Sequence, residues 1–169
     1  SEKVIKYLIN KYYKNNYICI CGTSAHKVYK IKSLLTKIDT LILNKQESFV
    51  LTNKNSIKSA LKYLIKKNNT LNIIITNGKN SVYAYKNKKT YLCKPPNVMV
   101  NNENSAGDVL SAVFNYYYCN TNKMYESLRK SVVAGALQAA GYLNNKKEYL
   151  QKINHLSKKI NIKVSNYNG

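Results

Sequence analysis

The sequence predicts an α/β protein with three layers, α/β/α, built around a mostly parallel sheet with one antiparallel hairpin. Amphipathic helical stretches alternate with short apolar strands over residues 2–76, the pattern that places helices on both faces of a parallel sheet. The last of these strands contains three consecutive isoleucines, as suits a strand buried on both faces. Asn77-Gly78 then interrupts the alternation, and the pattern that follows is typical of a hairpin.

The elements of the alternating part follow from apolar residues recurring every three or four positions in helices and from β-branched or aromatic runs in strands. In order, they are a helix over residues 2–14, a strand over 17–21, a helix over 25–37, a strand over 40–43, a polar turn with Gln46 and Glu47, a helix beginning at Ile57, and a strand over 71–76. Ser24 and Ser56 precede two of these helices and are expected to cap them.

The second half of the chain is predicted to be mainly helical after the hairpin. Its expected elements are hairpin strands over residues 82–85 and 90–93 with the turn near Asn87, a strand over 98–100, and helices over 107–118, 124–143 and 146–159. The 169 residues contain no internal repeat and no long linker, which predicts a single domain over residues 1–169.

The chain is strongly basic, with 28 Lys and Arg against 7 Asp and Glu and a net charge of +21. Arg129 is the only arginine, and Arg is the residue that usually reads guanine or phosphate with two hydrogen bonds. The lysines are interleaved with Asn, Tyr and Ile, a bias typical of AT-rich coding sequence. The charge therefore has two open explanations: drift in composition, or attraction of nucleotide phosphates or nucleic acid.

The four cysteines, Cys19, Cys21, Cys93 and Cys119, do not form a pattern typical of a metal site. Buried free thiols in a reducing compartment are the expectation. No stretch approaches the about 20 apolar residues of a membrane helix, and the first residues lack a secretory apolar region, so the cytoplasm is the expected location and no membrane partner is expected.

The segment over residues 100–108, Val-Asn-Asn-Glu-Asn-Ser-Ala-Gly-Asp, is the strongest candidate for chemistry. It is expected to follow a strand and open a helix, where free backbone N–H groups and the positive end of the helix dipole favour an anion. Small residues allow a phosphate to approach the main chain, and Asp108 is placed to take a proton from a hydroxyl. The alternative is that Asp108 only complements the helix N-terminus and Gly107 only forms a tight turn.

Ser105-Ala106-Gly107-Asp108 resembles the G-A-G-D signature of the ribokinase (PfkB-type) family of carbohydrate and nucleoside kinases. Two further segments appear in the family's order. Asn44-Lys45-Gln46-Glu47 is similar to its N-x-x-E element, and the segment from Thr76 to Ser81 is similar to its T-x-G-x-x-G element. The resemblance covers residues 17–143 and implies the ribokinase-like fold and an ATP-dependent kinase.

The resemblance also implies roles for individual residues. Asp108 would be the base, and the N–H groups of Ala106, Gly107 and Asp108, with Ser105 completing the signature, would form an anion hole for the transferred phosphoryl group. Asn44 and Glu47 would act on Mg²⁺ and its waters, with Glu47 as the metal residue. The residues implied to bind ATP are Asn44, Thr76, Gly78, Lys79, Asn104, Val133, Gly135 and Ala139. An ordinary turn with a capping glutamate is the alternative for Asn44 and Glu47.

Residues 21–27, Cys-Gly-Thr-Ser-Ala-His-Lys, resemble the E-P-T-S-V-x-K segment of pseudouridine kinases, which makes pseudouridine the best candidate acceptor. The alternative is that His26 and Lys27 are solvated residues on a first helical turn.

The chain departs from the family in several places. Ser105 replaces a Gly, Ser81 replaces another, and Asn102 stands where many relatives have the Asp of a monovalent-cation site, so potassium dependence is not expected by default. The sugar-binding N-terminal half of the family fold has no counterpart here, so the chain is expected to be the C-terminal part of a longer kinase.

The expected partners are ATP and a small sugar or nucleoside, with a homodimer possible. Nucleic acid is not expected. The alternatives kept open are a catalytically impaired nucleotide-binding remnant of the same fold and a basic nucleic-acid-binding module whose 16 tyrosines stack on bases.

Overall fold

The computed structural model describes residues 1–142 and 146–168 and has an α/β architecture. Its elements in order are α1 (Glu2–Tyr12), β1 (Cys19–Cys21), α2 (Ala25–Val28), the 3₁₀ helix η1 (Tyr29–Lys37), β2 (Thr40–Asn44), α3 (Lys45–Thr52), α4 (Ile57–Lys67), β3 (Asn72–Thr76), β4 (Val82–Lys86), β5 (Lys89–Cys93), α5 (Ala106–Thr121), α6 (Met124–Ala139), α7 (Lys146–Lys159) and β6 (Ile162–Asn166).

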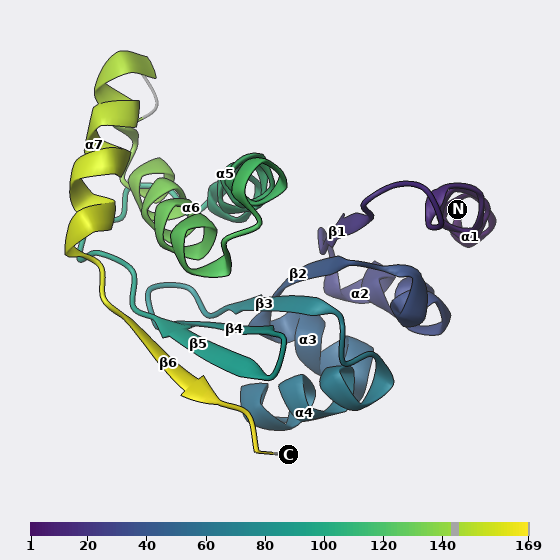
Figure 1. Ribbon diagram of the computed structural model, residues 1–169. Helices are drawn as coiled ribbons and strands as arrows, with labels where there is room; N and C mark the ends of the chain where they lie inside the picture. The colour runs from purple at the N-terminus through teal and green to yellow at the C-terminus, as the bar shows by residue number, and fades with distance from the viewer. Residues whose placement is uncertain (143–145, 169) are drawn as a thin grey trace. The chain divides into compact units, whose positions relative to one another are not determined.

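The strands form one mixed sheet in the order β1-β2-β3-β4-β5-β6 (Figure 1). β1, β2 and β3 are parallel, and β4 runs antiparallel to β3. Asn87 and Lys88 form the tight turn of the β4–β5 hairpin with φ of 47° and 61°, the left-handed conformation that such turns require. The predicted α/β fold class and the predicted hairpin are therefore confirmed.

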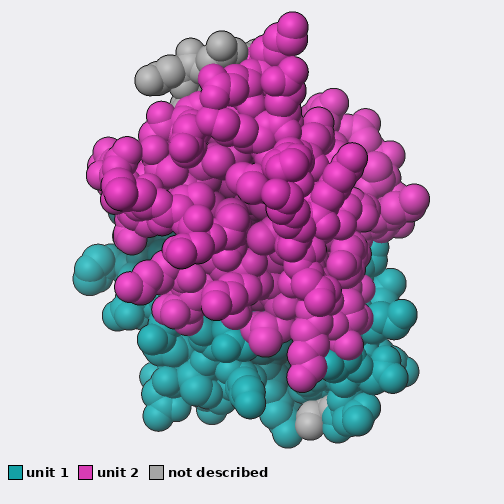
Figure 2. All heavy atoms as spheres, turned by 90° about the vertical axis from the view of Figure 1, so that its left-hand side faces the viewer, with its two compact units in different colours: residues 1–76, 83–90, 165–169 teal, residues 77–82, 91–164 magenta. Residues whose placement is uncertain are grey.

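The described residues group into two compact units, which Figure 2 distinguishes by colour. Unit 1 comprises residues 1–76, 83–90 and 165–169, and unit 2 comprises residues 77–82 and 91–164. Unit 1 contains β1–β3 with α1, α2, η1, α3 and α4, and unit 2 contains α5, α6 and α7.

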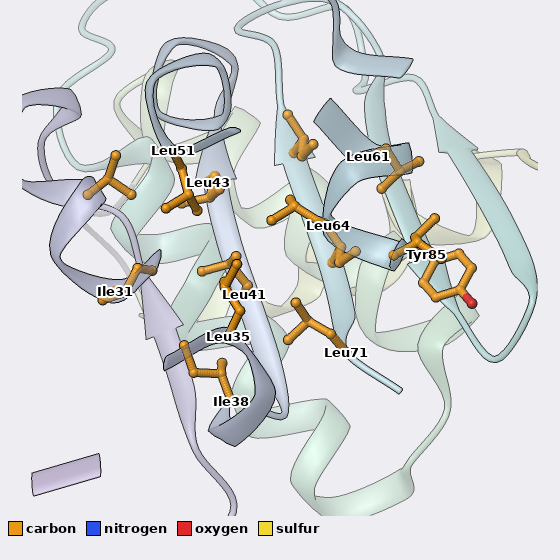
Figure 3. Close-up of a cluster of buried hydrophobic side chains, with 14 of the residues drawn as sticks. Ile31, Leu35, Ile38, Leu41, Leu43, Leu51, Leu61, Leu64, Leu71 and Tyr85 are labelled. Atoms are coloured by element: carbon orange, nitrogen blue, oxygen red, sulfur yellow. The ribbon is translucent and has the colours of Figure 1, made fainter. Parts of the chain in front are cut away.

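The core of unit 1 lies between the strands and the helices from α2 to α4 (Figure 3). Leu41 and Leu43 of β2 alternate with residues facing the other side, and both are at most 1% exposed. They meet Leu35 of η1, Leu51 of α3 and Leu64 of α4. The apolar stripe predicted for α4 is thus the face that packs on the sheet.

The core of unit 2 joins α6 to α7. Val133 and Leu137 of α6 pack with Tyr149 and Ile153 of α7, and the Tyr149 hydroxyl donates to the carbonyl of Ala134 at 2.8 Å. Within residues 1–142 and 146–168, every helix is too short or too polar to span a lipid bilayer.

Two predictions for the first half of the chain need correction. The helix predicted over residues 25–37 is only one α-helical turn followed by the 3₁₀ helix η1, and the Ser24 side chain does not cap it. The polar turn predicted after β2 is helix α3, because Asn44 and Glu47 form a capping box that starts a helix there.

The second half differs from prediction at three points. Residues 98–100 do not form a strand, and Met99 is 85% exposed, because no neighbouring strand pairs with this segment. The helix predicted over residues 124–143 ends at Ala139, and Leu143 lies outside the described residues. β6 was not predicted, since only Ile162 in it is buried and the apolar alternation of a strand is weak.

Candidate active site

The parallel strands of unit 1 bring three of the predicted segments to one edge of the sheet. Asn44, the last residue of β2, is the register partner of Thr76, the last residue of β3. Gly22 follows β1 directly, and its N–H donates to the carbonyl of Ile42 in β2 at 2.8 Å. The carboxyl ends of parallel strands are where α/β proteins bind ligands, and Gly22, Asn44 and Thr76 all lie there.

Asn44 and Glu47 bind each other across the first turn of α3. The Asn44 side chain accepts from the N–H of Glu47 at 2.9 Å, and the Glu47 carboxylate accepts from the N–H of Asn44 at 2.8 Å. Glu47 is only 2% exposed, while Asn44 is exposed. In this structure Glu47 therefore caps helix α3, which is the alternative role considered for it from the sequence.

Gly22 lies directly against this capping box. A β-carbon at position 22 would overlap the Glu47 carboxylate, lying 2.6 Å from its Cδ and 3.0 Å from its Oε1. A side chain at this position would therefore force the Glu47 carboxylate to move.

We expect Gly22→Ala to lower the free energy of unfolding by about 1 kcal/mol, the usual contribution of a helix cap. The added methyl group displaces the Glu47 carboxylate, and the first turn of α3 then loses its reciprocal hydrogen bonds. Urea denaturation followed by far-UV circular dichroism measures the loss.

The double variant Gly22→Ala, Glu47→Ala provides the control for this prediction. If the cost arises from the clash with Glu47, adding Ala at position 22 should cost little once Glu47 is Ala. An equal cost in both backgrounds would show that the methyl group disturbs something other than the capping box.

The candidate catalytic residues of unit 2 lie at the start of α5. Ser105 is the N-cap residue with φ 61° and no side-chain cap hydrogen bond. The Ala106 N–H donates to the carbonyl of Glu103 at 3.3 Å, so it is already engaged. Among the described residues, the N–H groups of Gly107 and Asp108 have no acceptor, as expected for a first helical turn. Two open amides, rather than the three inferred from the family signature, thus lie beside the exposed Asp108 carboxylate.

Gly107 has no packing reason to be glycine. A β-carbon built there meets no atom within 4 Å, and the residue is helical, where Gly costs about 1 kcal/mol relative to Ala. The glycine therefore keeps the space above the first turn of α5 open at the expense of helix stability.

Two residues of α6 hold this loop in place. Gly135 packs beneath the first residue of α5, since a β-carbon at position 135 would lie 2.9 Å from the Ala106 carbonyl oxygen. The Ala139 carbonyl accepts from the N–H groups of Asn101 and Asn102 at 2.8 and 3.0 Å. Gly135 and Ala139 are four residues apart and so share one face of α6. Both residues were predicted to lie near ATP, and in the structure they contact the segment that precedes Asp108.

The other residues predicted to bind ATP lie in varied surroundings. Val133 is fully buried in the unit 2 core, where it faces α7 rather than open space. Gly78 and Lys79 are exposed in the turn after β3, and Gly78 has φ 55°. Asn104 is exposed, and its N–H donates to the Asn102 side chain at 2.9 Å.

Burial shifts the titration of two groups in unit 2. It raises the pKa of the Cys93 thiol to about 12 and the pKa of the Tyr149 hydroxyl to about 12, so both stay protonated at neutral pH. Among the described residues, Cys19, Cys21, Cys93 and Cys119 form no disulfide bond. The prediction that they are buried is right for Cys93 only, since Cys119 is exposed and Cys19 and Cys21 are half-buried.

The donor set of unit 1 fits Mg²⁺ bound with a nucleotide. Mg²⁺ usually takes one or two carboxylates together with phosphate oxygens and waters. Asn44 and Glu47 offer oxygen ligands of that kind, and the described residues contain no cluster of three or more His, Cys, Asp or Glu that would hold an ion alone. The burial of Glu47 restricts it to a contact through its second oxygen or through a water.

The sequence profile described as pfkB family carbohydrate kinase matches residues 5–144. No curated protein matches the chain in sequence.

Solved structures match the chain over almost its whole length. A Clostridium perfringens protein assigned as a sugar kinase is 16% identical with a TM-score of 0.84, covering 99% of this chain and 54% of that one. A carbohydrate kinase from Agrobacterium tumefaciens is 20% identical with a TM-score of 0.76, covering 97% and 53%. An Escherichia coli protein assigned as ribokinase II, in complex with ATP and Mg²⁺, is 13% identical with a TM-score of 0.76, covering 92% and 53%. The chain spans about half the length of each of these proteins, and the similarity confirms the ribokinase-like fold.

Proposed function

The chain belongs to the pfkB family of carbohydrate kinases, and on that premise we propose that it supplies the ATP-binding and catalytic part of a kinase that phosphorylates a hydroxyl of a sugar or nucleoside. One observation carries the proposal. At the start of α5 the exposed Asp108 carboxylate shares a helical turn with the open N–H groups of Gly107 and Asp108, and Gly107 leaves the space above them empty.

In the proposed reaction Asp108 accepts the proton of the acceptor hydroxyl. The hydroxyl oxygen forms a bond to the γ-phosphorus of ATP as the bond from that phosphorus to the β–γ bridging oxygen breaks, and ADP leaves. The amides of Gly107 and Asp108, reinforced by the helix dipole, stabilise the negative charge on the transferred group.

Mg²⁺, when bound, would neutralise charge on the phosphates, and Asn44 and Glu47 are the residues proposed to hold it. Thr76, Gly78, Lys79 and Asn104 are proposed to line the nucleotide site, since each lies at the end of a strand or in an exposed turn. Gly135 and Ala139 contribute by fixing the loop that carries Asp108.

Pseudouridine is the proposed acceptor. This finer assignment is supported by residues 21–27, where Gly22 ends β1 beside Asn44 and Glu47 and where His26 and Lys27 are exposed. We also propose that full turnover requires additional polypeptide, because the similar structures are about twice as long.

The test is a screen of nucleosides and sugars with ATP and Mg²⁺, run in parallel on this 169-residue chain and on the product of the complete reading frame. Phosphorylation of pseudouridine above other acceptors is the expected result. Turnover of a hexose alone would correct the acceptor, and an absence of turnover with every acceptor would leave a nucleotide-binding remnant as the better assignment.

The backbone at Ser105 favours such a remnant. A non-glycine residue with φ 61° costs about 1 kcal/mol, and its β-carbon lies next to the proposed phosphate site. We expect Ser105→Gly to raise the free energy of unfolding by about 1 kcal/mol by removing this strain, and to raise turnover by removing the β-carbon. Chemical denaturation and initial rates measure the two effects separately.

Asn122→Gly is the matched control, because Asn122 caps the other end of the same helix with φ 54°. Asn tolerates this conformation better than Ser, so a smaller gain in stability and no change in turnover are expected. Equal turnover of the Ser105→Gly variant and the unmodified chain would mean that the β-carbon does not crowd the phosphate.

A further inference from the structure

Helix α4 has two faces of opposite character. One face is apolar and belongs to the core of unit 1, where Leu61 and Leu64 are among the buried side chains (Figure 3). The residues of the other face are spaced by three, one, three and one positions, so they form one row along the helix. This row consists of Ser59, Lys62, Tyr63, Lys66 and Lys67, and its three lysines are exposed.

The row borders a groove with a volume of about 540 Å³. All five of its residues line the groove, together with Lys54 from the loop between α3 and α4. The ring of Tyr63 is half-buried there, and its centroid lies 5.7 Å from Lys67 Nζ and 5.9 Å from Lys32 Nζ. The groove thus combines one aromatic ring with ammonium groups from η1, from α4 and from the loop before α4.

No carboxylate balances the charge of this groove. Residues 48–102 contain no Asp or Glu. In the part of the chain that the structure describes, none of the lysines that line the groove forms an ion pair. Ammonium groups gathered in one groove repel one another, and an anion bound among them offsets that repulsion. The groove therefore favours an anionic ligand.

The residue types in the lining distinguish between classes of polyanion. Binding to a lipid surface needs an exposed apolar face beside the basic residues, but the apolar face of α4 is buried in the core. Interfaces between proteins are depleted in Lys, whereas four of the six residues that line this groove are Lys. A positively charged groove with an aromatic ring, on which a base can stack, is the combination that binds single-stranded nucleic acid.

We propose that the α4 groove binds single-stranded nucleic acid. Lys54, Lys62, Lys66 and Lys67 contact its phosphates, and a base stacks on Tyr63. Lys provides a point charge without the planar fork with which Arg reads bases, so binding is independent of base sequence. The near absence of Arg from the chain therefore argues against base reading but not against binding to phosphates. The proposal uses none of the residues assigned to the kinase reaction.

Fluorescence anisotropy of a labelled oligouridylate of about 12 nucleotides, titrated with the product of the complete reading frame, tests the proposal. Four phosphate contacts predict that the logarithm of the association constant falls with the logarithm of salt concentration with a slope of about −2.8. The double variant Lys62→Gln, Lys66→Gln should lower affinity at least about tenfold at low salt and reduce the slope to about −1.4. An unchanged slope would overturn the proposal.

The double variant Lys158→Gln, Lys159→Gln is the matched control. It removes the same charge from exposed positions on α7 that do not line the groove, so affinity should change little. Equal losses in the two double variants would overturn the proposal, because net charge alone would then explain binding. Both variants should retain the far-UV circular dichroism spectrum and the turnover of the unmodified protein. A loss of oligonucleotide binding is thereby distinguished from a failure of the kinase proposal.

Substitutions of Tyr63 test the stacked base. Tyr63→Leu should weaken binding about 5- to 100-fold without changing the salt slope, and Tyr63→Phe, which keeps the ring, should bind like the unmodified protein. Equal affinity of Tyr63→Leu and the unmodified protein would overturn the proposal in favour of a ligand without bases, such as inorganic polyphosphate. Tighter binding of anionic vesicles or of a polyglutamate peptide would also overturn it. Binding of oligouridylate or of an oligothymidylate of equal length supports the proposal, and the tighter of the two identifies RNA or DNA as the source.

Discussion

Asp108→Asn is expected to lower turnover by about 10²- to 10⁴-fold, the usual contribution of a general base. The substitution keeps the shape of the side chain but removes the group that accepts the proton of the acceptor hydroxyl. ATP affinity should stay within a few-fold of the starting value, because the open amides of Gly107 and residue 108 belong to the backbone and remain in place. Initial rates and calorimetric titration of ATP, both on the product of the complete reading frame, measure the two effects.

Glu103→Gln is the control for this substitution. Glu103 is an exposed carboxylate in the same loop, and its removal changes the net charge by the same amount. We expect turnover of this variant to stay close to that of the unmodified enzyme. Equal losses for the two variants would mean that charge near the nucleotide, rather than proton transfer at Asp108, limits the reaction.

The second large effect is expected at Gly135, which touches no ligand in the proposed mechanism. Gly135→Ala places a methyl group 2.9 Å from the Ala106 carbonyl oxygen and 3.2 Å from the Leu110 Cβ. The first of these atoms belongs to the backbone and cannot rotate away, so α5 must shift relative to α6. Overpacking of this kind costs about 1–3 kcal/mol in the free energy of unfolding. Urea denaturation should show that loss, and turnover should fall because the shift moves Asp108.

Gly107→Ala separates packing from function at the same helix. A methyl group there meets no atom within 4 Å, and Ala favours helix over Gly by about 1 kcal/mol, so stability should rise. The methyl group occupies the space above the open amides, so ATP affinity should fall. A Gly107→Ala variant that binds ATP normally would argue against an anion at this position, and a Gly135→Ala variant of full stability would argue against the tight contact with Ala106.

Much of the fold was predictable because its signals are local. The apolar stripe of α4 with its cap at Ser56, the three isoleucines of β3 and the turn of the hairpin each lie within a few residues of chain. The limits of α7 at Lys146 and Lys159 agree with the helix predicted over residues 146–159.

The errors occurred where tertiary contacts decide the structure. Residues 98–100 have the composition of a strand, but a strand needs a neighbour, and none pairs with them. The apolar spacing of residues 25–37 does not distinguish an α-helix from a 3₁₀ helix. β6 joins the sheet with a single buried residue, which leaves little pattern to detect.

In the candidate site, too, features encoded in short stretches of sequence were predictable and tertiary contacts were not. The motifs that include Asn44, Thr76 and Asp108 are short stretches of sequence, and a family resemblance was enough to find them. The contacts of Gly22 with Glu47 and of Gly135 with Ala106 join segments 25 or more residues apart, and each glycine alone is uninformative. The roles proposed for these residues, and the assignment of one domain to residues 1–169, stay predictions.

Helix α6 contacts the segment that precedes Asp108 at two points, through Gly135 at Ala106 and through the Ala139 carbonyl at Asn101 and Asn102. The distance between these two points along α6 therefore determines where the Asp108 carboxylate lies. Inserting a single residue between Gly135 and Ala139 would rotate the second contact by about 100° and displace it by about 1.5 Å. One contact or the other would then be lost, and the segment carrying Asp108 would no longer be fixed at both ends. Homologous chains that phosphorylate their acceptor should therefore keep three residues between these two positions, whatever side chains they carry elsewhere in the helix.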